Sequence, residues 1–351
     1  MTLRPAIRTF LVHVLRAAAM LLLMYFLYRQ FATLDIVHVQ RLLFGMGAAA
    51  ALIMLPYASV IALDAAGWRG CMPPSRRRLS LAGLSAIRLS TDAVMNTVPA
   101  GVAIAETLRP LLLQKHFGLR TGEAVASTML AKINMAVMQM VFVICAVLLL
   151  TLQEGPRAEL GILATAHGQA IIIGVSVVFL LFLLLPYAGV RLERISKLLQ
   201  TLPLPPLQRL LTRVHGALCD IDTEIAGFVR GSRAQLASVL GIFLISWMMM
   251  AVETWLIFFL LGHELSLAQA VVLEGLLSAI KLVFFFIPSG LGAQELGIPA
   301  ILGVFGIPEV AAVAAAFIIL RRGKELTWSA TGLALFGALG VNPFRPALRK
   351  T

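Results

Sequence analysis

Charged residues are scarce in this sequence. Asp, Glu, Lys and Arg together make up 13% of its 351 residues, whereas 60% are hydrophobic. A soluble globular domain carries about 25% charged residues, so the composition argues against a water-soluble protein. Apolar runs close to the roughly 20 residues that cross a bilayer recur along the chain. The clearest runs are residues 42–63, 124–152, 161–190 and 236–261.

Cysteine and histidine are too few and too scattered to form a recognisable metal site. The three cysteines, Cys71, Cys145 and Cys219, lie far apart, and the six histidines show no HExxH or paired spacing. The chain also lacks the GxxxxGK[ST] loop that binds nucleotide phosphates and the GxSxG elbow of serine hydrolases. We therefore expect no metal, no cofactor and no direct use of ATP.

Less continuous apolar segments bring the total to about eight or nine helical elements. These segments are residues 10–28, 79–98, 265–288, 308–320 and 326–341. The sequence thus predicts an all-α polytopic membrane protein with a single transmembrane domain over residues 1–351. A basic cluster separates the last two segments, and we place it in a cytoplasmic loop. Its members are Arg321, Arg322 and Lys324.

The net charge of +12 comes from basic clusters between the apolar runs. Cytoplasmic loops hold an excess of Lys and Arg, which predicts a cytoplasmic N-terminus and gives no reason to expect a nucleic-acid partner. The long polar segment 191–234 repeats apolar residues at helical spacing. We expect amphipathic helices there, lying on the cytoplasmic surface. The segment separates a first pseudo-repeat, about residues 1–155, from a second, about residues 235–351.

Two short stretches interrupt the apolar pattern in the same way. PAGVAIAETLRP (99–110) and PSGLGAQELGIP (288–299) share Pro, Gly, Glu and Pro at a constant offset of 189 residues. An interrupted helix survives at membrane depth only where it is buried in protein or lines a wet cavity, and one interruption in each half is typical of repeat-built transporters. We expect two re-entrant broken-helix turns in an inverted repeat, with two ordinary helix-ending turns as the alternative. The break residues are Pro99, Gly101, Pro288, Gly290 and Gly292.

Ionisable side chains accompany both interruptions. A charge near the centre of a membrane helix costs about 2.5–3.5 kcal/mol on insertion scales, and such residues usually face the bundle or a pathway. Arg88 and Asp92 are four residues apart and should share one helix face. We assign substrate binding or transport to the side chains around the breaks, with structural ion pairing between helices as the alternative. They are Glu106, Arg109, Glu295, Lys132, Glu274 and Lys281.

These motifs resemble those of the flippase-like membrane region of the lysylphosphatidylglycerol synthase family. Its first motif, P-x-G-x-x-x-x-E-x-x-R followed by leucines, is matched by residues 99–113, and its second, P-G-G-L-G-x-x-E, by residues 288–295. A late helix that ends in Arg is matched at Arg321 or Arg322. Where many members have an Arg and an Asp after the first motif, this chain has Lys132 and Asn134. The resemblance adds Arg322 and Asn134 to the candidate site. Because Lys132 and Asn134 depart from the family's pattern, the resemblance does not determine which lipid headgroup the protein handles.

The resemblance implies lipid translocation between leaflets of a bacterial cytoplasmic (inner) membrane. It does not imply lysyl transfer, because we expect no synthase domain after the last helix. The expected cargo is a phospholipid, a hopanoid or an isoprenoid-linked lipid with an anionic or polar headgroup, and the overall style is similar to the subgroup associated with hopanoid biosynthesis. Lipid-biosynthesis enzymes are candidate partners. We expect a transporter and no enzyme; a non-catalytic scaffold of a lipid-synthesis complex and an intramembrane lipid-modifying enzyme are the alternatives.

Overall fold

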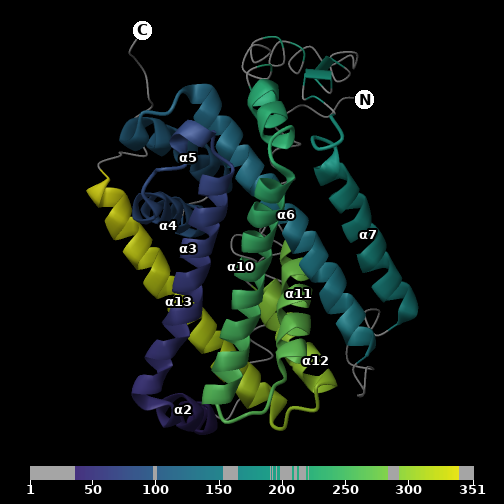
Figure 1. The fold of residues 1–351 in the computed structure, drawn as a ribbon. Helices are drawn as coiled ribbons and strands as arrows, with labels where there is room; N and C mark the ends of the chain where they lie inside the picture. The colour runs from purple at the N-terminus through teal and green to yellow at the C-terminus, as the bar shows by residue number, and fades with distance from the viewer. Residues whose placement is uncertain are drawn as a thin grey trace, which may run out of the picture. The chain divides into compact units, whose positions relative to one another are not determined.

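A computed structural model describes most of the chain. It covers residues 36–97, 101–152, 165–189, 221–283 and 292–339, with eight single positions between 191 and 219. Every regular element in these ranges is a helix (Figure 1). Four helices are long and apolar enough to cross a membrane: Gly47–Gly70, Thr121–Thr151, His167–Leu184 and Arg233–Leu260. The predicted all-α, multi-pass membrane protein is confirmed, while the predicted segment 10–28 lies outside the described residues.

The chain divides into two compact units. Unit 1 comprises Met1–Ile53, Val143–Ile173 and Ala251–Gly323, and unit 2 comprises Met54–Phe142, Gly174–Met250 and Lys324–Thr351. Four helices contribute residues to both units. They are α6 (Thr121–Thr151), α7 (Ala166–Leu184), α10 (Arg233–Leu260) and α13 (Val310–Ala338).

Unit 2 contains the helix pair α4 (Leu81–Thr97) and α5 (Gly101–Phe117), with α3 (Met54–Gly70) packed on α4 (Figure 1). The first residue of α5 must be small. A Cβ on Gly101 would lie 2.5 Å from the carbonyl oxygens of both Val94 and Met95. Glycine therefore permits the close approach between the end of α4 and the start of α5, as small residues do in membrane bundles.

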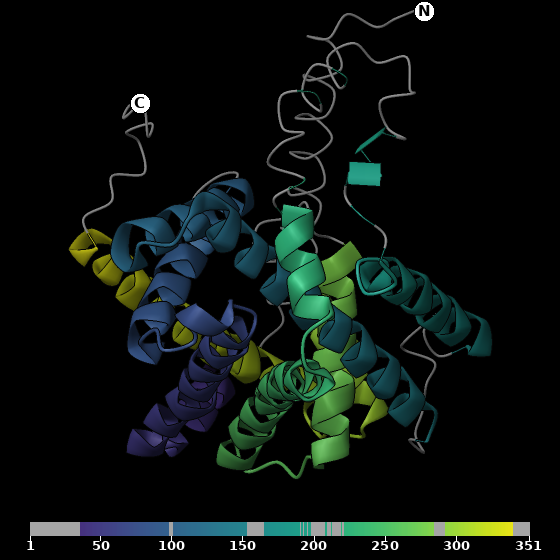
Figure 2. The same ribbon diagram turned by 45° about the horizontal axis from the view of Figure 1, so that its top comes forward.

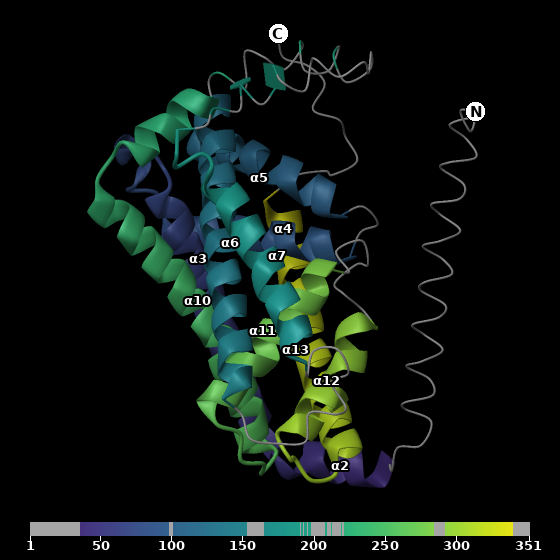
Figure 3. The same ribbon diagram turned by 90° about the vertical axis from the view of Figure 1, so that its right-hand side faces the viewer.

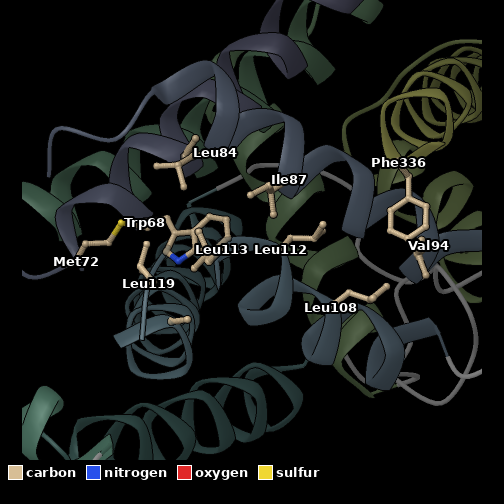
Figure 4. Close-up of a cluster of buried hydrophobic side chains, with 12 residues drawn as sticks. Trp68, Met72, Leu84, Ile87, Val94, Leu108, Leu112, Leu113, Leu119 and Phe336 are labelled. Atoms are coloured by element: carbon tan, nitrogen blue, oxygen red, sulfur yellow. The ribbon is translucent and has the colours of Figure 1, made fainter. Parts of the chain in front are cut away.

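Buried apolar side chains fill the space between these three helices. Figure 4 shows Trp68 of α3 in one cluster with Leu84 and Ile87 of α4 and Leu112 and Leu113 of α5. None of the five is more than 4% exposed. Lipid tails are as apolar as leucine, so close packing rather than removal from water holds such helices together. The cluster thereby fixes the helices that carry the charged side chains described below.

Unit 1 contains α2 (Ile36–Gly45), α11 (Leu267–Val283) and α12 (Ala293–Val304), and α11 packs against α12 (Figure 3). Gly292 precedes α12 with a φ of 88°, in the left-handed region that glycine adopts without strain. The Gly292 backbone N–H donates to Glu295 Oε2 at 2.8 Å. The Glu295 carboxylate therefore caps the first turn of α12.

The second proline of each motif does not end a helix. Pro110 lies inside α5 and Pro299 inside α12, so the interruptions are shorter than the full motifs that we expected to break. A proline offers no N–H to the carbonyl four residues before it. In both motifs that carbonyl belongs to the glutamate, Glu106 or Glu295. Each proline thus weakens the helix at the glutamate without stopping it.

The last two predicted segments form one helix. α13 runs from Val310 to Ala338 without interruption (Figures 1 and 2), so the predicted cytoplasmic loop between residues 308–320 and 326–341 is wrong. The basic residues that indicated a loop have partners within the fold. Lys324 is 2% exposed and its Nζ lies 4.5 Å from the centre of the Tyr57 ring, a cation–π contact that offsets part of the cost of burial.

The order of helices is the same in both halves of the chain. In each half, two helices separated by an interruption precede a long helix. The helices α4 and α5 precede α6, and α11 and α12 precede α13. Thr121 and Val310, the first residues of α6 and α13, are 189 positions apart, which is the offset between the two motifs. The inverted relation of the two pseudo-repeats stays a prediction.

Part of the polar segment 191–234 is described. Residues 221–229 are helical, and Ile221 and Ile225 are buried in a cluster with Leu130 and Phe243. At this end of the segment the apolar face contacts other helices of unit 2, whereas we expected it to face lipid. The helix over residues 221–229 therefore packs against Leu130 of α6 and Phe243 of α10. The cytoplasmic position of the segment stays a prediction.

Candidate functional site

Six charged side chains form a continuous chain of contacts in unit 2. We call them the charge network; in order of contact they are Asp64, Arg88, Asp92, Arg109, Glu106 and Lys132. They come from α3, α4, α5 and α6, and acids alternate with bases along the chain. An unpaired charge at membrane depth is costly, and the alternation gives each member a neighbour of opposite sign.

Asp64 closes the buried end of the network. It is 4% exposed, contacts Arg88 Nη2 and accepts a hydrogen bond from Ser246 Oγ of α10 at 2.5 Å. Arg88 Nη2 also lies 3.6 Å from Asp92 Oδ2, so Arg88 and Asp92 share a face of α4. Asp64 was not predicted as a site residue; it directly follows the predicted apolar run 42–63. An acid inside an apolar helix was the available signal.

Arg109 joins α5 to α4. Its Nη2 contacts Asp92, its Nε donates to Thr91 Oγ1 at 3.0 Å, and its Nη1 donates to Glu106 Oε1 at 3.1 Å. Arg109 is 7% exposed. One planar group therefore reaches three acceptors on two helices, an arrangement that an ammonium group does not reproduce.

Glu106 and Lys132 form the accessible end of the network. Lys132 Nζ lies 2.6 Å from Glu106 Oε1, and their side chains are 42% and 34% exposed. Glu106 Oε1 is thus shared by a cation of α5 and a cation of α6. A carboxylate that water still reaches can be replaced by another anion at lower cost than one that is fully buried.

A cavity of about 130 Å³ lies along the network. Its charged lining residues are Asp64, Arg88, Asp92, Arg109 and Lys132. Glu106 is not in the lining, but its Oε1 contacts both Arg109 and Lys132, so the three acids and three bases of the network balance one another. Trp68 of α3 and Phe243 of α10 add aromatic walls. The cavity therefore combines apolar surface with charged donors and acceptors from four helices, α3, α4, α5 and α6.

Unit 1 holds a second set of buried charges. Arg321 of α13 contacts Glu274 of α11 through both guanidinium amino groups, and Thr254 of α10 donates to the same carboxylate. The Glu274 side chain is 3% exposed. The next residue, Arg322, donates from Nε to Glu295 Oε1 of α12 at 2.6 Å. Two adjacent arginines thus connect α13 to α11 and to α12.

Each motif glutamate contacts a cation of the next helix. Glu106 of α5 contacts Lys132 of α6, and Glu295 of α12 contacts Arg322 of α13. In each half, the carboxylate that follows the interruption meets a cation on the next helix along the chain. Glu106 alone has an additional cation within its own helix, Arg109, because residue Ile298 stands at the offset position in α12.

The remaining predicted site residues lie elsewhere. Asn134 is buried, donates from Nδ2 to the Leu130 carbonyl at 2.7 Å and accepts from Tyr187 Oη at 2.9 Å, outside the lining of the cavity. Lys281 is exposed in the last turn of α11. Among the described residues, no group of three or more His, Cys, Asp or Glu side chains could hold a metal ion. The predicted break residues outside the described ranges are Pro99, Pro288 and Gly290.

A protein-family model described as "Lysylphosphatidylglycerol synthase TM region" matches residues 11–321. The matched range holds both Pro-Gly motifs and every member of the charge network. No curated protein and no solved structure matches the chain. The chain belongs to this family, whose description points to a function related to membrane lipids.

Proposed function

We propose that this member of the lysylphosphatidylglycerol synthase TM-region family moves polar-headgroup lipids between the leaflets of a bacterial cytoplasmic membrane and leaves them chemically unchanged. One observation carries the proposal. The charge network runs from the half-exposed contact of Glu106 with Lys132 to Asp64, which is 4% exposed, along a cavity. A protein that only holds partners together does not need ionisable groups arranged in this way.

The physical argument starts from the barrier to lipid movement. A polar headgroup that enters the hydrocarbon layer loses its water, and an ion transferred without partners loses several kcal/mol even after the protein relaxes. Fixed donors and acceptors replace that water without reorganising. Arg109 and Lys132 can meet a phosphate or carboxylate, and Asp92 and Glu106 can meet an amine. The network therefore lowers the barrier for a charged or zwitterionic headgroup.

The repeated arrangement of helices supports transport by alternating access. In transporters built from inverted repeats, the site lies between discontinuous helices, and the two sides open in turn. Each half of this chain supplies an interrupted helix pair, a glutamate after the interruption and a cation on the next helix. With the basic loops inside, the N-terminus is cytoplasmic. The enzymes that synthesise the transported lipid are the partners that this function calls for.

Leaflet exchange in proteoliposomes tests the proposal. The purified full chain is reconstituted with a tail-labelled fluorescent lipid, and a membrane-impermeant reductant reports the fraction that has changed leaflets. We expect faster exchange than in protein-free vesicles, with lipid masses unchanged by mass spectrometry. A new lipid mass would favour the enzyme alternative. Exchange at the protein-free rate would contradict transport.

A further inference from the structure

We propose that α13 bends at Gly323 during transport, and that Gly323 is the hinge at which the two units of the chain move. The inference rests on the proposed function, because alternating access requires a part of the molecule that moves. Gly323 belongs neither to the two Pro-Gly motifs nor to the charge network. Hinges of this kind are single positions at which the backbone angles absorb a movement of packed elements.

The two halves of α13 belong to different units. The helix is continuous from Val310 to Ala338 (Figure 1). The boundary between the units falls between Gly323 and Lys324. Residues before this boundary are part of unit 1, and residues after it are part of unit 2. Any movement of one unit against the other must therefore be absorbed within the helices that cross the boundary, and α13 is one of them.

Two ion pairs fix the residues directly before Gly323. Arg321 contacts Glu274 of α11 through both guanidinium amino groups, and Arg322 Nε donates to Glu295 Oε1 of α12 at 2.6 Å. The side chains of the two acids are only 3% and 7% exposed. Breaking a buried ion pair leaves an uncompensated charge and is strongly unfavourable. This part of α13 therefore moves together with α11 and α12.

Other contacts fix the helix from the next residue onward. Lys324 is 2% exposed, and its Nζ lies 4.5 Å from the centre of the Tyr57 ring in α3. Further along, α13 approaches α4 so closely that a Cβ on Gly332 would clash with the carbonyl oxygen of Leu89. One residue thus separates side chains fixed to unit 1 from side chains fixed to unit 2.

Packing does not account for glycine at position 323. An added Cβ would have no atom of the described residues within 4 Å, in contrast to the Cβ on Gly332. Inside a helix, glycine is disfavoured relative to alanine by about fivefold, which corresponds to about 1 kcal/mol. Glycine in return adopts backbone angles that strain other residues. A glycine that the packing does not require, placed between two fixed segments, points to a need for bending.

A second helix shows the same coincidence. The boundary crosses α7 between Ile173 and Gly174, and a Cβ on Gly174 would likewise meet no described atom within 4 Å. The boundary therefore falls beside an unpacked glycine in two of the four helices that cross it. The other two, α6 and α10, have no glycine next to the boundary. Long helices can curve gently without one.

Gly323→Ala tests the hinge, because a methyl group fits there and favours the straight helix. We expect about fivefold slower leaflet exchange of a tail-labelled phosphatidylglycerol, with an equal or higher midpoint of thermal unfolding. Gly337→Ala is the matched control, since it makes the same change near the end of the same helix, also without a contact within 4 Å among the described residues. Wild-type exchange by Gly323→Ala would overturn the hinge, and so would slow exchange with a lower midpoint.

Distances between spin labels measure the movement itself. Labels are attached at position 120 of unit 2 and position 309 of unit 1, where the native side chains are 78% and 63% exposed. The full chain without its three native cysteines is studied in lipid nanodiscs by double electron–electron resonance. We expect two populations of distances, whose ratio shifts about fivefold in Gly323→Ala but not in Gly337→Ala. A single distance, or a ratio that Gly323→Ala leaves unchanged, would overturn the inference.

The two proposals fail separately. A shift of the distances by Gly323→Ala in a protein that does not exchange lipid would leave the hinge standing and remove the transport function. Equal exchange by the wild type and by Gly323→Ala would do the reverse.

Discussion

At Arg109, the shape of the side chain matters as much as its charge. The guanidinium holds Asp92, Thr91 and Glu106 at once in a site where Asp92 is 8% exposed. Lysine keeps the charge but presents a compact, flexible ammonium group. The substitution would leave the buried acceptors of α4 and the Glu106 carboxylate of α5 without their fixed donor.

We predict that Arg109→Lys lowers leaflet exchange about tenfold, nearly as far as Arg109→Ala, because charge-assisted contacts to several acceptors are lost together. The rate is measured in proteoliposomes at equal protein content, with thermal unfolding as a check of the fold. Arg120→Lys is the matched control, since the Arg120 side chain is 78% exposed beside Glu123. A wild-type exchange rate for Arg109→Lys would show that only the positive charge at this position matters and not the shape of the guanidinium group.

Glu106 differs from the other acids of the network because water reaches it. We predict that Glu106→Gln binds phosphatidylglycerol more tightly and exchanges it more slowly, since a competing anion is removed from Arg109 and Lys132 and the headgroup leaves them less readily. The change in unfolding free energy should stay below about 1 kcal/mol, because the contact is partly exposed.

The control for Glu106→Gln is Glu193→Gln, which alters another Glu–Lys pair with the same 2.6 Å separation outside the network. Native mass spectrometry measures binding and the vesicle assay measures exchange. Weaker lipid binding by Glu106→Gln would mean that Glu106 holds the headgroup rather than competing with it.

At the scale of elements, the junction between α4 and α5 depends on Gly101. A methyl group there would lie 2.5 Å from two carbonyl oxygens of α4. We predict that Gly101→Ala lowers the free energy of unfolding by about 1–3 kcal/mol through overpacking, and slows exchange by moving Arg109 relative to Asp92. Gly241→Ala in α10 is the control, because its Cβ would meet nothing within 4 Å and alanine favours the helix. Thermal unfolding in detergent compares the two; equal midpoints would contradict the close packing described here.

Helices were predicted well where the apolar run was unbroken and poorly where charge interrupted it. The runs 42–63, 124–152 and 236–261 each overlap a helix that is long enough to cross a membrane. The run 308–341 was divided at Arg321–Lys324, although it is one helix. Its charges are compensated by Glu274, Glu295 and the Tyr57 ring, which are distant in sequence, and hydropathy alone does not reveal such partners.

The residues of the candidate site were likewise predicted only in part. Regular spacing placed Arg88 and Asp92 on one helix face, and the shared motif selected Glu106 and Arg109. Asp64 was missed, because its place in the network depends on Arg88 in the next helix and on Ser246 in α10. Contacts within a helix follow from periodicity, whereas contacts between helices follow from packing that no local pattern encodes.

For the whole molecule, the offset of 189 residues allows a prediction of which side of the membrane two equivalent positions face. Arg120 follows α5 and Glu309 follows α12 at equivalent positions, and their side chains are 78% and 63% exposed. If the pseudo-repeats are inverted, these positions face opposite sides of the membrane. Single cysteines at 120 and 309, in a chain without its native cysteines, are labelled with an impermeant maleimide in intact spheroplasts and in inverted vesicles. Labelling from the same side would exclude an inverted repeat and leave a parallel one.

The central claim is that the charge network carries a lipid headgroup between leaflets, and leaflet exchange of phosphatidylglycerol in proteoliposomes tests it most directly. The assay compares wild type, Arg109→Lys, Glu106→Gln and the control Glu193→Gln, all shown to be folded and equally reconstituted. We predict rapid exchange by wild type and the control, slow exchange by both network variants, and no change in lipid mass. Exchange by wild type no faster than in protein-free vesicles, or exchange by the network variants at the wild-type rate, would contradict the claim.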